Sequence, residues 1–108
     1  MKSSQRPVRG RVYGATLPGI GTEKFFLVVS NNTRNERLPS VLALRLTTSS
    51  KPEIATVVPL LTETVFRGSV LCDDVVEIFH EEITRDLGAL SRSTMARVNH
   101  GLKVALGL

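Results

Sequence analysis

Arg45 and Thr47 stand two residues apart in a segment, 41–47, in which leucine alternates with other side chains. That alternation predicts a strand, so both side chains leave the same face of a sheet. A guanidinium beside a hydroxyl is suited to hold an anion such as a phosphate group. A solvent-facing arginine explains Arg45 equally well, and by itself a threonine at a strand end is usually just a good strand former. Polar and basic residues that could line the same surface follow directly: Ser49, Ser50 and Lys51.

The other reactive side chains are weaker candidates. His80 and His100 are of the type used in acid–base catalysis, but neither has a partner at an informative spacing. Asp73 and Asp74 could contribute to a metal site, yet an adjacent acidic pair without further ligands is weak evidence for one. Cys72 falls in a predicted strand and is interpreted as a core residue rather than a nucleophile. We therefore expect no metal site and no cofactor.

Positive charge is concentrated in one half of the chain. The net charge is +4, but residues 1–51 carry nine Lys and Arg against two acidic residues, whereas residues 52–108 carry five against eight. A basic half favours an anionic partner, most commonly a nucleic acid, although it could simply be a soluble basic surface. Aromatic residues make up only 5% of the chain, so extensive base stacking is not expected.

Length and composition indicate a single globular domain. The 108 residues are enough to bury a core, and the hydrophobic fraction of 42% is ordinary for a folded protein. No apolar run approaches the length of a membrane span, and residues 1–7 lack the apolar stretch of a signal peptide. A single cysteine excludes an intrachain disulfide and a cysteine-based zinc cluster. We expect a cytoplasmic protein with a flexible tail at 1–8 and one domain at 9–108.

The elements that must position the candidate residues are mostly strands. Residues 25–29 form an unbroken apolar run, which predicts a strand covered on both faces. The glycine-rich segment 18–22 predicts a mobile loop, and the polar segment 30–39 predicts turns or a short helix. Strands are predicted at 9–17, 25–29, 41–47, 54–61 and 69–79, with a turn near 67–68.

One helix closes the chain. Ser91 is a suitable helix N-cap, and apolar residues then recur at helical spacing at Met95, Val98, Leu102 and Leu106. Several short strands followed by one helix predict a mainly β fold, a small β-barrel with helical additions.

Three stretches, in this order, resemble the MazF/PemK family of toxins. The first is Arg9-Gly10-Arg11-Val12-Tyr13, the second runs from Gly21-Thr22-Glu23 to Asn35, and the third is Leu44-Arg45-Leu46-Thr47-Thr48. Weaker agreement continues through 68–73, 88–91 and the last helix, so the resemblance spans nearly the whole chain.

The resemblance implies an SH3-like β-barrel with a C-terminal helix, assembled as a homodimer. It implies a metal-independent endoribonuclease toxin that cuts single-stranded RNA at a short preferred sequence. It also implies a cognate antitoxin whose acidic, disordered segment covers the RNA-binding groove. Because RNA supplies its own nucleophile, the 2′-hydroxyl, the expected products carry 2′,3′-cyclic phosphate and 5′-hydroxyl ends.

Site residues follow from matching positions. Lys24 matches an arginine of the family that proline normally follows, where this chain has Phe25, and Thr47 matches the threonine that ends the third strand. Glu23 corresponds to a glutamate of the first loop, as a general base or as a residue that holds Lys24. Lysine offers a point charge in place of a planar fork, so this replacement alters how a phosphate is bound. The expected catalytic residues are thus Lys24, Thr47 and Glu23, and the expected RNA-binding residues are Arg45, Thr48, Ser49, Ser50, Lys51 and Arg34.

Two other classes of function stay open. A gyrase-poisoning toxin of the CcdB type resembles this family in architecture, but its tail contains a tryptophan and this chain has none. A non-catalytic nucleic-acid-binding barrel needs the basic half of the chain but not Lys24 and Thr47 in particular. Cleavage of RNA in the presence of a chelator separates the three.

Overall fold

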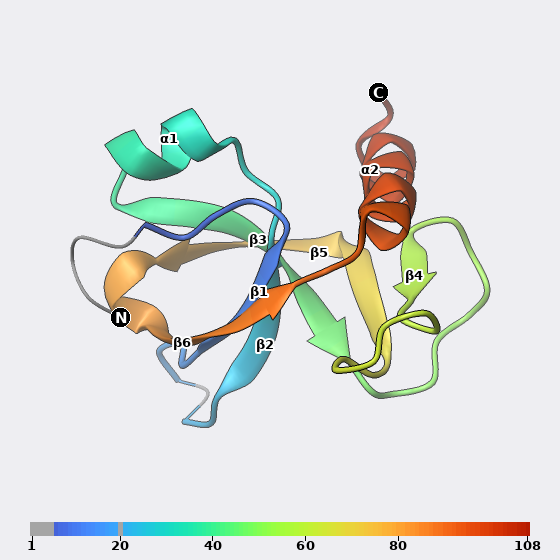
Figure 1. Ribbon diagram of the computed structural model, residues 1–108, viewed down its shortest axis with the longest axis horizontal. Coiled ribbons are helices and arrows are strands. Elements are labelled where there is room, and N and C mark those ends of the chain that lie inside the picture. The colour runs from blue at the N-terminus through green and yellow to red at the C-terminus, as the bar shows by residue number, and fades with distance from the viewer. Residues whose placement is uncertain (1–5, 20) are drawn as a thin grey trace.

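The computed structural model describes residues 6–19 and 21–108. It contains one six-stranded antiparallel sheet in the order β4-β5-β3-β2-β1-β6, with two α-helices outside it (Figure 1). The elements are β1 (Arg11–Ala15), β2 (Lys24–Val28), α1 (Asn32–Arg37), β3 (Ser40–Thr47), β4 (Val57–Pro59), β5 (Ser69–Phe79), a 3₁₀ turn η1 (His80–Glu82), β6 (Ile83–Ala89) and α2 (Arg92–Leu106). The predicted mainly β fold with a closing helix is confirmed. The sheet itself stays open, because β4 and β6 are its two edges.

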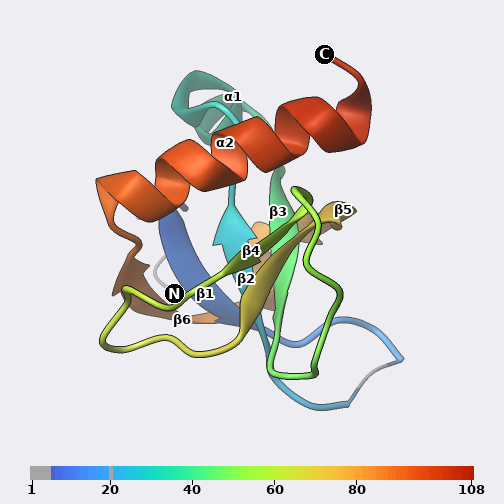
Figure 2. The same cartoon turned by 90° about the vertical axis from the view of Figure 1, so that its right-hand side faces the viewer.

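Both faces of the sheet are buried, and alternate residues of one strand enter different cores. Val12 and Leu44 belong to a core that Val98 of α2 covers, whereas Tyr13 and Ala43 belong to a second core on the other face. In Figure 2, α2 runs across one face of the sheet, where it contacts β4 and β5. The sheet therefore has a buried cluster on each face, and α2 packs against one of them.

The closing helix begins as predicted. Ser91 is the N-cap, and its Oγ accepts a hydrogen bond from the N–H of Thr94. Leu106 departs from the prediction, since its side chain is 59% exposed. At about 100° per residue, Ala105 returns to the direction of Val98 while Leu106 is rotated away from it. None of the helices in the described part of the chain is long and apolar enough to cross a membrane.

Several predicted boundaries differ from the structure. The strand predicted at 54–61 is only β4, and β6 was not predicted, because its residues alternate too weakly to mark a strand. Phe25 is 38% exposed, so the run at 25–29 is not covered on both faces throughout. Of the predicted tail, residues 1–5 lie outside the described residues, as does Ile20 of the predicted loop. Pro7, within that tail, is buried, and the N–H of Val8 donates to the Tyr13 hydroxyl at 2.9 Å.

Candidate active site

A groove opens where two neighbouring strands separate. The ladder between β2 and β3 ends at the pair Phe26 and Arg45, although β2 begins two residues earlier and β3 ends two residues later. Extending the register places Lys24 opposite Thr47 on the face that carries Arg45. The two residues matched to the family's catalytic positions therefore both line the groove between the separating strand ends. The groove is lined by Glu23, Lys24, Phe25, Arg45, Leu46, Thr47, Thr48, Ser49 and Arg67.

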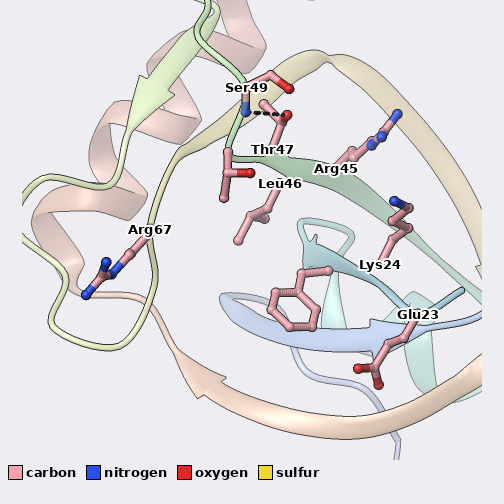
Figure 3. A pocket seen from close by; sticks show the side chains of 9 residues that line it. Glu23, Lys24, Arg45, Leu46, Thr47, Ser49 and Arg67 are labelled. Carbon is pink, nitrogen blue, oxygen red and sulfur yellow. Dashed lines mark hydrogen bonds between the residues drawn. The ribbon is translucent and has the colours of Figure 1, made fainter.

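Three cations border this groove. Lys24 and Arg45 extend on one side of it, and Arg67 lies at the opposite end (Figure 3). Arg67 precedes Gly68 in the turn that leads into β5, and φ of Gly68 is +90°. A Cβ on Gly68 would strike the Thr47 carbonyl oxygen, so only glycine allows this turn to pack against the end of β3. Local backbone chemistry thus sets Arg67 at the edge of the groove, with its guanidinium directed away from Lys24 and Arg45 in Figure 3.

The Thr47 hydroxyl is oriented by a hydrogen bond from the backbone. Its Oγ1 accepts a hydrogen bond of 3.2 Å from the N–H of Ser49, as the dashed line in Figure 3 marks. A hydroxyl that accepts from the backbone still has its own proton to donate. The side chain can therefore donate to an anion lying between Thr47 and the nearby cations.

Glu23 is bound to β6 rather than to Lys24. Its carboxylate accepts hydrogen bonds from Arg85 at 2.7 and 3.1 Å and from the Thr84 hydroxyl, and in Figure 3 it points away from the Lys24 ammonium. Gly14 of β1 lies between these partners, and a Cβ there would come within 2.9 Å of Thr84 Oγ1 and strike Glu23. The Glu23 carboxylate is therefore paired with Arg85 and not with the Lys24 ammonium.

The same pairing affects the acid–base chemistry of Glu23. Hydrogen bonds from Arg85 and Thr84 lower its pKa. A carboxylate with a lowered pKa is a weak base at neutral pH. These contacts tie Glu23, the residue before Lys24, to β6.

The sequence analysis did not predict Phe25, Arg67 and Arg85 as residues of this region. The Arg85 guanidinium lies 5.8 Å from the centre of the Phe25 ring, a cation–π distance. Phe25 and Arg67 line the groove. Phe25 occupies the position where the family usually has proline, which was the available signal. Arg67 and Arg85 are distant from Lys24 in sequence, and no local pattern marks them.

Other expected RNA-binding residues lie apart from the groove. Arg34 of α1 donates to the Ser40 carbonyl oxygen at 2.6 Å, so its guanidinium joins α1 to β3. Lys51 lines a separate hollow beside β4, and Ser50 is exposed outside the groove lining. Only Arg45, Thr48 and Ser49 of the expected RNA-binding set line the groove.

Cys72 and the two histidines also lie elsewhere. Cys72 is buried, and burial raises the pKa of its thiol to about 11, which confirms its interpretation as a core residue. Burial and the charge of Arg6 lower the pKa of His80, whose Nδ1 lies 2.8 Å from an Arg6 nitrogen. His100 is exposed on α2. Within residues 6–19 and 21–108, no three His, Cys, Asp or Glu side chains gather closely enough to hold a metal ion.

Known proteins resemble this chain along nearly its full length. The family model described as PemK-like, MazF-like toxin of type II toxin–antitoxin system matches residues 8–106. Endoribonuclease MazF1 of Mycobacterium bovis and endoribonuclease MazF4 of Mycobacterium tuberculosis are each 38% identical over 102 residues, which cover 94% of this chain and 94% of theirs.

Solved structures also resemble it. An endoribonuclease from a mycobacterial species, solved in complex with its cognate antitoxin, has a TM-score of 0.87 at 36% identity, covering 94% of this chain and 96% of that one. A MazE–MazF structure from Deinococcus radiodurans has a TM-score of 0.82 at 21% identity, covering 96% of this chain and 98% of that one, a likeness of fold.

Proposed function

The chain belongs to the PemK-like, MazF-like toxins of type II toxin–antitoxin systems, and from that premise we propose that it cuts single-stranded RNA without a metal ion. It is an endoribonuclease toxin, as its mycobacterial relatives are named. The finer proposal is that it cuts at a short preferred sequence and leaves 2′,3′-cyclic phosphate and 5′-hydroxyl ends. The observation that carries the proposal is that Lys24, Arg45 and Thr47 line one groove, where β2 and β3 separate.

Lys24, Arg45 and Thr47 each have a role in the transesterification that cuts the RNA chain. Lys24 and Arg45 bind the scissile phosphate and stabilise the negative charge that grows on it, and the Thr47 hydroxyl donates to one of its oxygens. The 2′-hydroxyl loses its proton to solvent, its oxygen bonds to phosphorus, and the bond from phosphorus to the 5′-oxygen breaks. Lys24 supplies the proton that the departing 5′-oxygen takes up.

In this proposal Glu23 is a positioning residue that restrains the backbone of Lys24. Its carboxylate is fastened by Arg85 and Thr84, so the residue before Lys24 is tied across β1 to β6. This tie limits the motion of the Lys24 backbone at the open end of the ladder. Because the Lys24 backbone is restrained, its flexible side chain has fewer conformations to lose when the ammonium group binds the phosphate.

An antitoxin is the second partner. The mycobacterial relative was solved with its cognate antitoxin, and residues 1–51 of this chain carry the excess of positive charge. We infer that an acidic segment of the antitoxin lies in the same groove and excludes RNA. A homodimer is the assembly that the family likeness implies, and light scattering of the purified protein tests it.

The proposed function is tested by incubating the purified protein with a long single-stranded RNA in EDTA and mapping the ends of the fragments. We expect discrete cuts with 2′,3′-cyclic phosphate and 5′-hydroxyl ends. Lys24→Ala and Thr47→Ala should each lower the rate by about 100-fold or more, the usual effect of removing one group that stabilises developing charge. Lys103→Ala, which removes an exposed lysine of α2, is the matched control and should cut at the normal rate.

Two results would contradict the proposal. Full activity of folded Lys24→Ala and Thr47→Ala proteins would place the catalytic site elsewhere. Intact RNA across diverse sequences would favour the gyrase-poisoning or the non-catalytic binding function, and supercoiling and RNA-binding assays would then separate those two.

A further inference from the structure

A second hollow adjoins the groove and shares two of its cations. Its volume is about 310 Å³. Lys24 and Arg45 border both spaces, so a phosphate held by them would lie at the boundary between groove and hollow. The second hollow is lined by Leu17, Lys24, Phe26, Arg45, Asp74 and Val76.

An irregularity of β5 lies beside this hollow. Leu44 of β3 pairs with Val75 of β5, and Leu46 pairs with Val70. Between these pairs β3 has one residue, Arg45, while β5 has the four residues 71–74. Such a bulge bends the strand and redirects its side chains, a device often found beside functional sites. Here it brings the partly buried Asp74 into the lining of the hollow that Arg45 also borders.

The lining is chemically mixed. Phe26 is buried and contributes an apolar wall together with Leu17 and Val76. Asp74 adds one carboxylate, and its side chain takes part in none of the hydrogen bonds or ion pairs found in the described part of the chain. A second phosphate would be repelled by this carboxylate. A flat base fits better, because its faces suit apolar walls and its edge can offer N–H groups to an acceptor.

We propose that this hollow binds a nucleobase next to the scissile phosphate and that Asp74 selects bases carrying an exocyclic amino group. Cytosine, adenine and guanine present such a group, from which an aspartate can accept a hydrogen bond, whereas uracil has a single ring N–H flanked by two carbonyl oxygens that repel a carboxylate. Asp74 is then a specificity-determining residue that touches the base and leaves the chemistry to Lys24 and Thr47. The proposal rests on the proposed function, because the phosphate that places the base is the one held by Lys24 and Arg45.

The first test maps cleavage of an RNA library with randomised positions. The wild-type protein should use uracil about tenfold less than the other bases at one of the two nucleotides flanking the cut, the discrimination expected of one good base contact. Asp74→Asn offers donors as well as an acceptor, so it should raise the use of uracil at that position about tenfold. Asp73→Asn is the matched control, since it makes the same change at an exposed neighbour outside the lining, and it should keep the wild-type preference.

The second test measures binding without cleavage. Short oligonucleotides with 2′-deoxy sugars at the flanking nucleotides lack the attacking hydroxyl and differ only in the base at each flanking position. The wild-type protein should bind the uracil-containing versions about tenfold more weakly at one position, and Asp74→Asn should remove that difference.

The two tests separate the proposals. A wild-type protein that cuts no RNA would overturn the proposed function, and the binding preference would still decide the role of Asp74. Unchanged base preference of the Asp74→Asn protein in both assays would overturn the role of Asp74. Equal binding of uracil and the other bases by the wild-type protein at both positions would overturn it as well.

Discussion

Replacing Gly68 with alanine should destabilise the fold and displace Thr47 together. Gly68 has φ of +90° in the turn before β5. A Cβ at this position would strike the Thr47 carbonyl oxygen and lie 2.8 Å from the Thr47 carbonyl carbon and 3.0 Å from Thr48 Cα. These are backbone atoms of the groove, so no side-chain rotation can relieve the overlap.

The expected loss in the free energy of unfolding of Gly68→Ala has two parts. A left-handed backbone costs an L-residue about 1–2 kcal/mol, and the added methyl group costs about 1–3 kcal/mol where its neighbours must shift. Gly68→Ala should therefore lower the free energy of unfolding by about 2–5 kcal/mol. Gly10→Ala is the matched control, because Gly10 has the same φ of +90° and a Cβ there meets nothing within 4 Å. It should lose only about 1–2 kcal/mol.

The assay is urea denaturation of both variants beside the wild-type protein, followed by RNA cleavage under conditions in which each is folded. The folded Gly68→Ala protein should also cleave more slowly, because the end of β3 must move, whereas Gly10→Ala should cleave at the wild-type rate. Equal losses of stability in the two variants would refute the inference that contact with the β3 backbone requires glycine at 68.

Further predictions concern charge, acid stability and thiol reactivity. Each groove cation that neutralises a phosphate of single-stranded RNA contributes about −0.7 to the slope of log K against log salt concentration, so Arg67→Gln should make a measured slope shallower by about 0.7; an unchanged slope would remove Arg67 from the interface. An acidic antitoxin segment should displace bound RNA in a competition assay, and simultaneous binding would contradict a shared groove. Burial alone would raise the pKa of Glu63, but hydrogen bonds from Ser91 and Thr94 outweigh it and lower the pKa. Stability from that carboxylate is present above its ordinary pKa of 4.5 and is lost as the pH falls; Glu63→Gln should thus cost about 1 kcal/mol at pH 7 and little at pH 3 in urea titrations, and an equal cost at both would contradict this. The Cys72 thiol, with a pKa of about 11, should react with iodoacetamide at pH 8 only as the protein unfolds, so rapid alkylation of the folded protein would contradict its burial.

The sequence by itself determined the local elements. The alternation at 41–47 predicts β3 to within one residue, the predicted strand at 69–79 is β5 without change, and Ser91 marks the start of α2. These signals are local, because strand periodicity and helix capping depend on side chains a few positions apart. The family resemblance added Lys24 and Thr47, which no local pattern distinguishes from an ordinary strand boundary.

Only the tertiary structure decided how these elements make a site. The opening of the groove depends on where the ladder between β2 and β3 stops, and that depends on which strands compete for the same backbone groups. Glu23 contacts Arg85 because β1 lies between β2 and β6, with Gly14 of β1 between the two side chains. Arg34 hydrogen-bonds to Ser40 and does not line the groove. Such contacts join residues far apart in the chain, so their energies depend on the packed sheet and leave no periodic trace in the sequence.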